Sequence, residues 1–502
     1  MPSSATPSDP STSNPSPEPA PSSASASPSV EAFTQLDLRP ELITAADALG
    51  YHTMTPVQAK SLPALIEGRD LIAQAKTGSG KTAAFAMSLL NRLDEQAYHT
   101  QALVICPTRE LAEQVAEEIR RLARHIPNVK TLTLCGGRPM GPQLASLKRA
   151  PHIVVGTPGR LLKHLAKQTL DLSKVQSLVL DEADRMLGMG FIDDIDDIDD
   201  YLPQARQTLL FSATFPEEIA QLSAEFQTDP IDIRIEAGEA NAQISQRFYR
   251  TERSERLELV LRLLDEQRPE STLIFCNQKH QCEQLKDDLW QHDLHALALH
   301  GDMEQFERDR TLIQFANGSS SILVATDVAA RGIDINELDL VVCFELSADP
   351  EVHVHRIGRT GRAGHQGLAV SLVMPSEENR AAAIASYMDS AISYASADTL
   401  PPSAPYKLYP AMVTLSIGGG KRDKLRPGDV LGALTATGTV AGSQIGKISV
   451  LDRLCYVAVE QAAAKTAVAL LKWAQLTDGT YAVALLNDSK IKGRRYQARR
   501  LR

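Results

Sequence analysis

The fold is decided by the stretch Ala75-Lys76-Thr77-Gly78-Ser79-Gly80-Lys81-Thr82, which lies between an apolar run at 71–73 and another at 83–90. This order predicts a strand, a glycine-rich turn and the start of a helix. In that setting backbone N–H groups can surround a polyphosphate, Lys81 can bind its outer oxygens and the Thr82 hydroxyl can bind Mg²⁺. The general P-loop pattern has glycine at the position where this chain has Ala75. The alternative to a phosphate-binding loop is a glycine turn that only joins a strand to a helix.

Length and composition favour several domains without a membrane span. A chain of 502 residues can form two or three domains with separate cores, and we expect three. No apolar run approaches the ~20 residues needed to cross a bilayer, and the N-terminus lacks signal-peptide features, so we expect a cytoplasmic protein without a membrane partner. The six cysteines are scattered without Cys-x-x-Cys spacing and are expected to be buried free thiols.

The charge is distributed unevenly along the chain. The net charge is −10, but residues 405–502 carry eight Lys and eight Arg against five Asp and one Glu, which leaves +10 on this segment and −20 on the remainder. A basic tail on an acidic body predicts an electrostatic contact with a polyanion. The alternative is a basic surface that serves solubility alone.

The segment 31–237 has the pattern of a parallel sheet covered by helices, after a Pro-, Ser- and Ala-rich extension over 1–30 that is expected to be disordered. Apolar strands at 102–106, 131–135 and 152–156 each lead into a polar loop. Such loops meet at the carboxyl edge of the sheet, where ligands bind. Their side chains and N–H groups could hold a sugar-phosphate backbone, and the candidates are Arg109, Gly137, Thr157 and Arg160.

Two residues ahead of the cradle have the chemistry to recognise a purine. The Gln58 amide can donate and accept at the edge of a base, and the Phe33 ring can stack on its face. A lone Phe and a lone Gln are also common as packing and surface residues.

The acidic sequence Asp181-Glu182-Ala183-Asp184 ends an apolar strand expected at 177–180. Asp181 can hold Mg²⁺ through water, and Glu182 can orient or deprotonate an attacking water. Two like charges at a strand end repel each other unless a cation or a reaction requires them, so a purely structural role is the weaker alternative. Further along, residues 192–201 predict an amphipathic helix with an acidic face, and a strand at 208–211 leads into Ser212-Ala213-Thr214.

The order of these motifs resembles that of the DEAD-box ATP-dependent RNA helicases. The resemblance is carried by Phe33, Gln58, the cradle, Pro107-Thr108-Arg109-Glu110-Leu111, Asp181-Glu182-Ala183-Asp184 and Ser212-Ala213-Thr214. In that family the first cradle position is normally Ala, which matches this chain. The resemblance implies two tandem RecA-like domains, ATP and Mg²⁺ as cofactors, Lys81 and Glu182 as catalytic residues, and a coupling role for Ser212 and Thr214.

The segment 244–395 repeats the alternation of strands and helices without a second cradle, after a linker expected at 238–242. It supplies motifs at 300–308, 326–334 and 355–362. Arg359 and Arg362 lie three residues apart, which predicts one helical face from which both could reach a γ-phosphate. The resemblance implies that these two are arginine fingers and that Asp334 contacts the ribose, and we assign Thr326 to RNA binding and His355 and Arg356 to coupling.

Residues 405–502 predict a small α+β domain after a connection rich in Ala, Ser and Pro at 376–404. The expected order is strand, helix, two strands, helix and a last strand at 490–496, as in an RNA-recognition motif. Its usual stacking aromatics are largely missing, so we expect its basic side chains to contact RNA: Lys421, Arg422, Lys424, Arg426, Lys490, Lys492, Arg494 and Arg495. The basic turn and the Lys-Ile-Lys-Gly strand resemble those of the DbpA branch of the DEAD-box family, in which 474–489 would be an insertion.

The sequence therefore predicts an ATP-dependent RNA helicase whose site forms only when two domains meet. The DbpA-like tail implies binding to a hairpin of 23S ribosomal RNA and to precursors of the large ribosomal subunit. We expect a monomer that separates short duplexes locally and without processive movement. Two alternatives stay open: a general RNA helicase with a non-specific basic tail, and an RNA clamp that uses ATP only to lock on.

Overall fold

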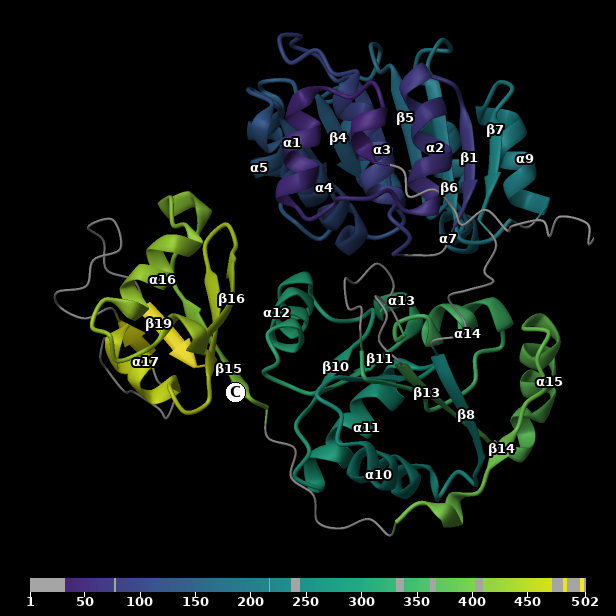
Figure 1. Ribbon diagram of the computed structural model, residues 1–502, viewed down its shortest axis with the longest axis vertical. Coiled ribbons are helices and arrows are strands. Elements are labelled where there is room, and N and C mark those ends of the chain that lie inside the picture. The colour runs from purple at the N-terminus through teal and green to yellow at the C-terminus, as the bar shows by residue number, and fades with distance from the viewer. Residues whose placement is uncertain are drawn as a thin grey trace, which may run out of the picture.

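The computed structural model describes residues 32–75, 78–215, 217–235, 244–330, 338–361, 367–401 and 410–471, together with the backbone of two short strands at 482–484 and 497–500. These residues form three sheets (Figure 1). Each sheet has hydrophobic core residues packed against it. The first two sheets are parallel and the third is antiparallel. The predicted fold class, two parallel-sheet domains followed by a small α+β domain, is confirmed.

The first sheet has the strand order β3-β4-β2-β5-β6-β1-β7. Its strands are β1 (Leu71–Gln74), β2 (Ala102–Ile105), β3 (Thr131–Leu134), β4 (Ile153–Gly156), β5 (Ser177–Asp181), β6 (Gln207–Ser212) and β7 (Ile231–Arg234). The helices are α1 (Pro40–Ala48), α2 (Pro56–Glu67), α3 (Lys81–Asn91), α4 (Arg109–Leu122), α5 (Met140–Leu147), α6 (Pro158–Leu165), α7 (Ala183–Gly188), α8 (Ile192–Asp199) and α9 (Glu217–Phe226). Two core clusters, one with α1 to α4 and one with α6 to α9, cover the two faces, which is why the strands are apolar throughout.

The second sheet has the strand order β10-β11-β9-β12-β13-β8-β14. Its strands are β8 (Ile244–Arg250), β9 (Thr272–Phe275), β10 (Ala296–Leu299), β11 (Ile322–Ala325), β12 (Leu340–Cys343), β13 (Gly367–Val373) and β14 (Tyr394–Ala395). The helices are α10 (Arg256–Gln267), α11 (Lys279–Gln291), α12 (Gln305–Ala316), α13 (Asp327–Ala330), α14 (Pro350–Ile357) and α15 (Glu378–Tyr387). The linker expected at 238–242 lies outside the described residues.

The prediction that 376–404 is a connection is wrong for most of that segment. Helix α15 packs Ala381 and Ile384 against Phe248 of the sheet, and β14 adds an edge strand beside β8. The sequence of this segment has little hydrophobic periodicity because it is rich in alanine. Alanine, however, has the highest helix propensity, so a few apolar anchors are enough to dock an alanine-rich helix.

The third sheet has the strand order β16-β17-β15-β19-β18. Its elements are β15 (Met412–Ile417), α16 (Pro427–Thr435), β16 (Ile445–Val450), β17 (Cys455–Glu460), α17 (Ala464–Leu470), β18 (Ala482–Ala484) and β19 (Gln497–Arg500). The strand predicted at 490–496 lies outside the described residues, and β15 pairs with β17 on one side and with β19 on the other. Part of the segment 474–489, expected to be an insertion, is the edge strand β18, which pairs with β19.

The face of the third sheet opposite its own core lies against the second domain, near α12 (Figure 1). Thr414, Tyr456 and Ala458 on this face are each about 1% exposed, although none belongs to the core cluster of the tail. Thr414 Oγ1 accepts from Asn317 Nδ2 at 3.1 Å and lies 2.6 Å from Ser319 Oγ, just after α12. A face that is covered in this way cannot stack on bases, in agreement with the missing aromatic pair.

Three further predictions can be compared with the described residues. Residues 192–199 form the expected acidic helix, with Ile195 and Ile198 buried. All six cysteines are buried and free. Within the part of the chain that the structure describes, no helix is both long and apolar enough to cross a bilayer.

Candidate active site at the domain seam

The phosphate cradle occupies the turn between β1 and α3. Gly80 caps α3 with a φ of 95°, and a Cβ at this position would lie 2.6 Å from Gln58 Nε2 and 2.9 Å from Thr55 Oγ1. Both the backbone conformation and the crowding therefore require glycine. Gly78 and Ser79 precede it and Thr82 follows Lys81 in the first turn of α3, whereas Thr77 lies outside the described residues.

The two predicted purine contacts are placed differently. Gln58 caps the start of α2 by accepting from Thr55 N at 2.8 Å, and its Nε2 donates to Gly80 O at 3.2 Å, so it ties α2 to the cradle. Phe33 is 4% exposed and belongs to the core cluster of the first domain. The structure thus places Gln58 against the cradle, while the Phe33 ring is packed against core residues.

The cradle lysine and the first acid of the 181–184 motif are both buried. Lys81 Nζ donates to Ala75 O, and burial lowers the pKa of this lysine. Burial, followed by repulsion from Glu182, raises the pKa of Asp181 to about 7. Beside them, at the end of β6, Ser212 Oγ is a buried hydroxyl that has no hydrogen-bond partner among the described residues.

These groups suit a hydrated divalent cation. A buried carboxylate whose ionised form is disfavoured gains most from a nearby positive charge, and oxygen donors are the ligands that Mg²⁺ prefers. The hydroxyls of Ser212 and Thr82 add neutral oxygens to the same region. The donor set therefore fits the predicted ion, with Asp181 and Thr82 as the candidate protein contacts.

Glu182 is held in an unusual backbone conformation. Its φ of 56° and ψ of 53° lie in the left-handed region, which is uncommon for residues other than glycine. Its side chain is buried, and its Oε2 accepts from Arg185 Nη1 at 2.6 Å. Backbone strain maintained by tertiary contacts is typical of functional sites, and Arg185 fixes where the Glu182 carboxylate points.

Asp184 links the acidic motif to the 212–214 loop and to the second domain. Its Oδ2 accepts from Ala213 N at 3.1 Å and from Thr214 N at 3.0 Å. Thr214 Oγ1 lies 3.1 Å from this oxygen and 2.8 Å from Glu351 Oε1 at the start of α14. Because the hydroxyl has one proton, it can serve one carboxylate at a time. His355 also lies here: one carboxylate oxygen each of Asp184 and Glu351 and one ring nitrogen of His355 lie within 4.8 Å of one another.

Arg359, predicted on a helical face, does not lie in a helix. Helix α14 ends at Ile357, and Arg359 lies in the turn that follows, because Thr360 leaves the helix to bridge to Leu338. Arg359 lines a cleft with Arg185 of the first domain and His355 of the second. Arg362 and Asp334 lie outside the described residues.

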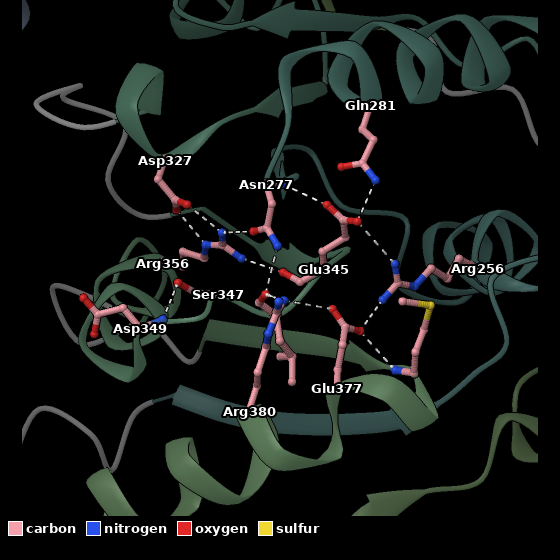
Figure 2. A network of polar contacts seen from close by, with 12 residues as sticks. Arg256, Asn277, Gln281, Asp327, Glu345, Ser347, Asp349, Arg356, Glu377 and Arg380 are labelled. Carbon is pink, nitrogen blue, oxygen red and sulfur yellow. Dashed lines mark hydrogen bonds and ion pairs between the residues drawn. The ribbon is translucent and has the colours of Figure 1, made fainter.

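Arg356 also lines this cleft, and its guanidinium is bound by groups of its own domain (Figure 2). It is 1% exposed and binds Asp327 with two hydrogen bonds of 2.6 Å, from Nε and Nη2. It also donates to Glu345 O at 2.6 Å and to Asn277 Oδ1 at 2.7 Å. These contacts join the segments that follow β9, β11 and β12, so Arg356 ties α14 to its own domain.

The predicted RNA contacts of the first domain lie on the other half of its sheet. Arg109 begins α4 after β2, Gly137 lies in the loop after β3, and Thr157 and Arg160 lie at the start of α6 after β4. Strands β2, β3 and β4 are neighbours in the sheet. Gly137 has a φ of 73°, and a Cβ there would lie 2.0 Å from Arg109 Nη1. Strands β5, β6 and β1 carry the phosphate cradle and the acids, so the order of the strands separates the two sets. Thr326 follows β11 in the second domain.

The start of α4 contacts α12 across the seam. Arg109 donates to Gln305 at 2.7 Å, and Arg308 binds Glu110 Oε1 through Nε at 3.1 Å and Nη2 at 2.7 Å. Both side chains of the second pair are about nine-tenths buried. Helix α12 therefore lies between the first domain and the tail.

The basic turn of the tail is exposed. Lys421, Arg422, Lys424 and Arg426 all have exposed side chains beside the start of α16. Backbone bonds from Lys421 N to Leu451 O and from Arg422 N to Asp452 O fix this turn against the β16–β17 hairpin. The other predicted basic contacts, Lys490, Lys492, Arg494 and Arg495, lie outside the described residues.

Several residues of the seam and of the network around Arg356 were not predicted from the sequence. Arg185 had a signal, since it follows the acidic motif three residues after Glu182, a spacing at which helical side chains meet. Glu351 follows Asp349-Pro350, a recognisable helix start. Asn277, Glu345 and the pairing of Glu110 with Arg308 had no local signal, because their partners are distant in the chain.

The phosphate cradle, the paired acids and a second sheet that supplies arginine to the same seam define a two-domain P-loop helicase. Family models agree: DEAD/DEAH box helicase matches residues 55–222, Helicase conserved C-terminal domain matches 255–364, and DbpA RNA binding domain matches 414–483. The chain belongs to the DbpA branch of the DEAD-box family and is an ATP-dependent RNA helicase.

Known proteins support this assignment along nearly the whole chain. The ATP-dependent RNA helicase DbpA of Escherichia coli is 52% identical over 474 residues, which cover 94% of this chain and 100% of that protein. The DEAD-box ATP-dependent RNA helicase CshA of Bacillus cereus is 43% identical over 69% of this chain and 66% of that protein. The structure of S. cerevisiae Dbp5 bound to RNA and ADP BeF3 has a TM-score of 0.68 at 30% identity, and covers 73% of this chain and 96% of that one.

Proposed function

We propose that ATP is hydrolysed in the seam between the two parallel-sheet domains and that neither domain completes the site alone. The observation that carries this proposal is the contact of Thr214 Oγ1 with Asp184 of the first domain and Glu351 of the second, beside a cleft lined by Arg185, His355 and Arg359. Similarity to Dbp5 bound to RNA and ADP BeF3 supports it, because the matched region includes both domains.

Within this seam each residue has a separate task. Lys81 and the cradle N–H groups bind the phosphates, and Gln58 holds the cradle in shape. Asp181 and Thr82 would hold Mg²⁺, which neutralises charge on the phosphate oxygens when it is bound. Glu182 orients the attacking water and accepts its proton, while Arg359 and Arg362 stabilise the charge that develops on the transferred phosphoryl group.

The test of this arrangement is Arg359→Ala. An arginine finger contributes about 10³–10⁵ in rate in related chemistry, so turnover should fall almost to the background rate. ATP binding should change little, since its phosphate cradle lies in the first domain. RNA-stimulated ATP hydrolysis and ATP binding should be measured on the same preparation. Normal hydrolysis by this variant would refute the proposal that the ATP site is completed in the seam.

The RNA proposed for the tail is a hairpin of 23S ribosomal RNA in precursors of the large subunit, encountered by a monomer in the cytoplasm. The exposed turn with Lys421, Arg422, Lys424 and Arg426 supports contact with RNA. The match to the DbpA RNA binding domain supports the proposed kind of RNA. Stimulation of ATP hydrolysis by 23S fragments and by unrelated structured RNAs should be compared, with and without residues 405–502. Equal stimulation by both kinds of RNA would favour a general helicase.

The proposed mode of unwinding is local. About 5.5 kcal/mol of differential binding drives a two-state clamp from mostly open to mostly closed, and a duplex step costs roughly 1.4 kcal/mol. One closure can therefore disrupt only about four steps. Displacement of short duplexes should fall steeply with length, whereas retention without displacement would favour the ATP-locked clamp.

A further inference from the structure

The loop between β12 and α14 carries the positioning contacts of the arginine-bearing helix. It comprises residues 344–349 and leads directly into Pro350, the first residue of α14. Helix α14 contains only eight residues, and His355 and the turn with Arg359 lie at its far end. A short helix has little packing surface of its own, so its position depends on how its ends and side chains are held.

Glu345 closes a ring of hydrogen bonds in this loop (Figure 2). Its carboxylate Oε2 accepts from Asn277 N at 3.0 Å. The Asn277 side chain then accepts from Arg356 Nη2 at 2.7 Å and donates to Leu346 O at 3.0 Å. Arg356 Nη1 returns to the carbonyl of Glu345 at 2.6 Å. The ring thus joins the loop after β9, the loop after β12 and the last turn of α14.

The same loop is held from its other side by a buried ion pair. Arg256 binds Glu377 at 2.5 Å, and both side chains are at most 5% exposed. Its Nη1 lies 3.7 Å from Glu345 Oε1, and its guanidinium carbon lies 5.4 Å from the centre of the Phe344 ring. Glu377 contacts Arg256, Arg380 and Met374 N, and none of these three groups belongs to the ring. Glu345 and Glu377 therefore share Arg256 and differ in whether they belong to the ring.

We propose that Glu345 is a positioning residue for ATP hydrolysis: through Asn277 and Arg356 it sets the position of α14 and so of the arginine that faces the seam. The inference rests on the proposed function of Arg359. Glu345 is not among the residues that line the cleft with Arg185 and Arg359, and its effect is transmitted by the ring of hydrogen bonds. Displacement of a catalytic group by about 1 Å can cost about 100-fold in rate, so a small shift of α14 is enough.

The test compares Glu345→Ala and Glu345→Gln with Glu377→Ala in the full chain. Glu345→Ala should lower kcat at saturating RNA by about 10- to 100-fold and change KM for ATP by less than about threefold, because the phosphate cradle is untouched. Glu345→Gln keeps an acceptor for Asn277 N, and its kcat should lie between those of the wild type and Glu345→Ala. Glu377→Ala should lower the melting temperature at least as much as Glu345→Ala, with kcat within about threefold of the wild type below that temperature.

Arg359→Ala measured in parallel distinguishes failure of the positioning role of Glu345 from failure of the proposed function. If Arg359→Ala is inactive while both Glu345 variants keep wild-type kcat, the positioning role is refuted and the proposed function stands. If Arg359→Ala hydrolyses ATP normally, the proposed function fails first. Equal losses of kcat in Glu345→Ala and Glu377→Ala would also overturn the inference, because they would show a general loss of stability in place of positioning. Should Glu345→Ala not fold, Glu345→Gln against Glu377→Ala decides by the same criteria.

Discussion

The pair formed by Glu110 and Arg308 should control closure of the seam, and its removal can be predicted in magnitude. Two hydrogen bonds, of 2.7 and 3.1 Å, join the Arg308 guanidinium to one oxygen of Glu110. The two side chains are 11% and 10% exposed, although they belong to different domains. When the domains separate, both charges become available to water. Loss of one partner therefore leaves the other charge buried and unpaired only in the closed form.

Removing one partner of a buried ion pair costs 3–5 kcal/mol, and the residual exposure places this pair at about 3 kcal/mol. Since 1.4 kcal/mol is tenfold, Arg308→Ala should weaken closure by about 150-fold. The double variant Glu110→Ala/Arg308→Ala leaves no unpaired charge and loses only the net contribution of the pair, about 1 kcal/mol or about fivefold. The single variant should therefore be more defective than the double variant.

Fluorescence energy transfer between labels on the two domains, with RNA and a non-hydrolysable ATP analogue, measures the closed fraction directly. The RNA concentration needed for half-maximal ATP hydrolysis reports the same equilibrium. Arg120→Ala is a matched control, because its partner Glu117 is exposed and lies on the same helix as Glu110. The reasoning is refuted if Arg308→Ala closes like the wild type, or if the double variant is as defective as the single one.

Three further perturbations have defined outcomes. Burial lowers the pKa of His353 to about 4, below its ordinary value near 6.5. The protein should therefore lose up to about 3 kcal/mol of stability as the pH falls from 6.5 to 4. Urea unfolding of His353→Gln should lack this pH-dependent loss of stability. Thr414→Glu places a charge in the contact with Asn317 and should undock the tail, seen as a larger radius of gyration in X-ray scattering, with hairpin binding by the tail unchanged. Arg185→Ala frees the Glu182 carboxylate and should lower kcat about tenfold or more, with partial recovery in Arg185→Lys; unchanged kcat would show that Arg185 does not position Glu182.

The position of the motifs could be predicted because they lie at strand ends, and parallel strands bring their carboxyl ends to one edge. The cradle after β1 and the acids after β5 follow this rule. The direction of individual side chains does not follow from it. Phe33 packs in the core, and α15 was missed because its alanines carry little hydrophobic pattern although they favour a helix. The contact of the tail with the second domain depends on Thr414, whose burial comes from residues about a hundred positions away.

Arg356 and Arg359 show why spacing alone could not assign their roles. Both belong to the motif at 355–362, and both are almost fully buried. Helix α14 ends between them, and both line the cleft with Arg185. Arg356 differs in that its guanidinium is bound to Asp327, Glu345 and Asn277 of its own domain. Loss of either side chain would lower turnover, but by different routes: Arg356 holds four short hydrogen bonds within the fold, so its loss must also reduce stability. Stability measured beside turnover therefore separates an arginine that positions the site from one that faces the nucleotide.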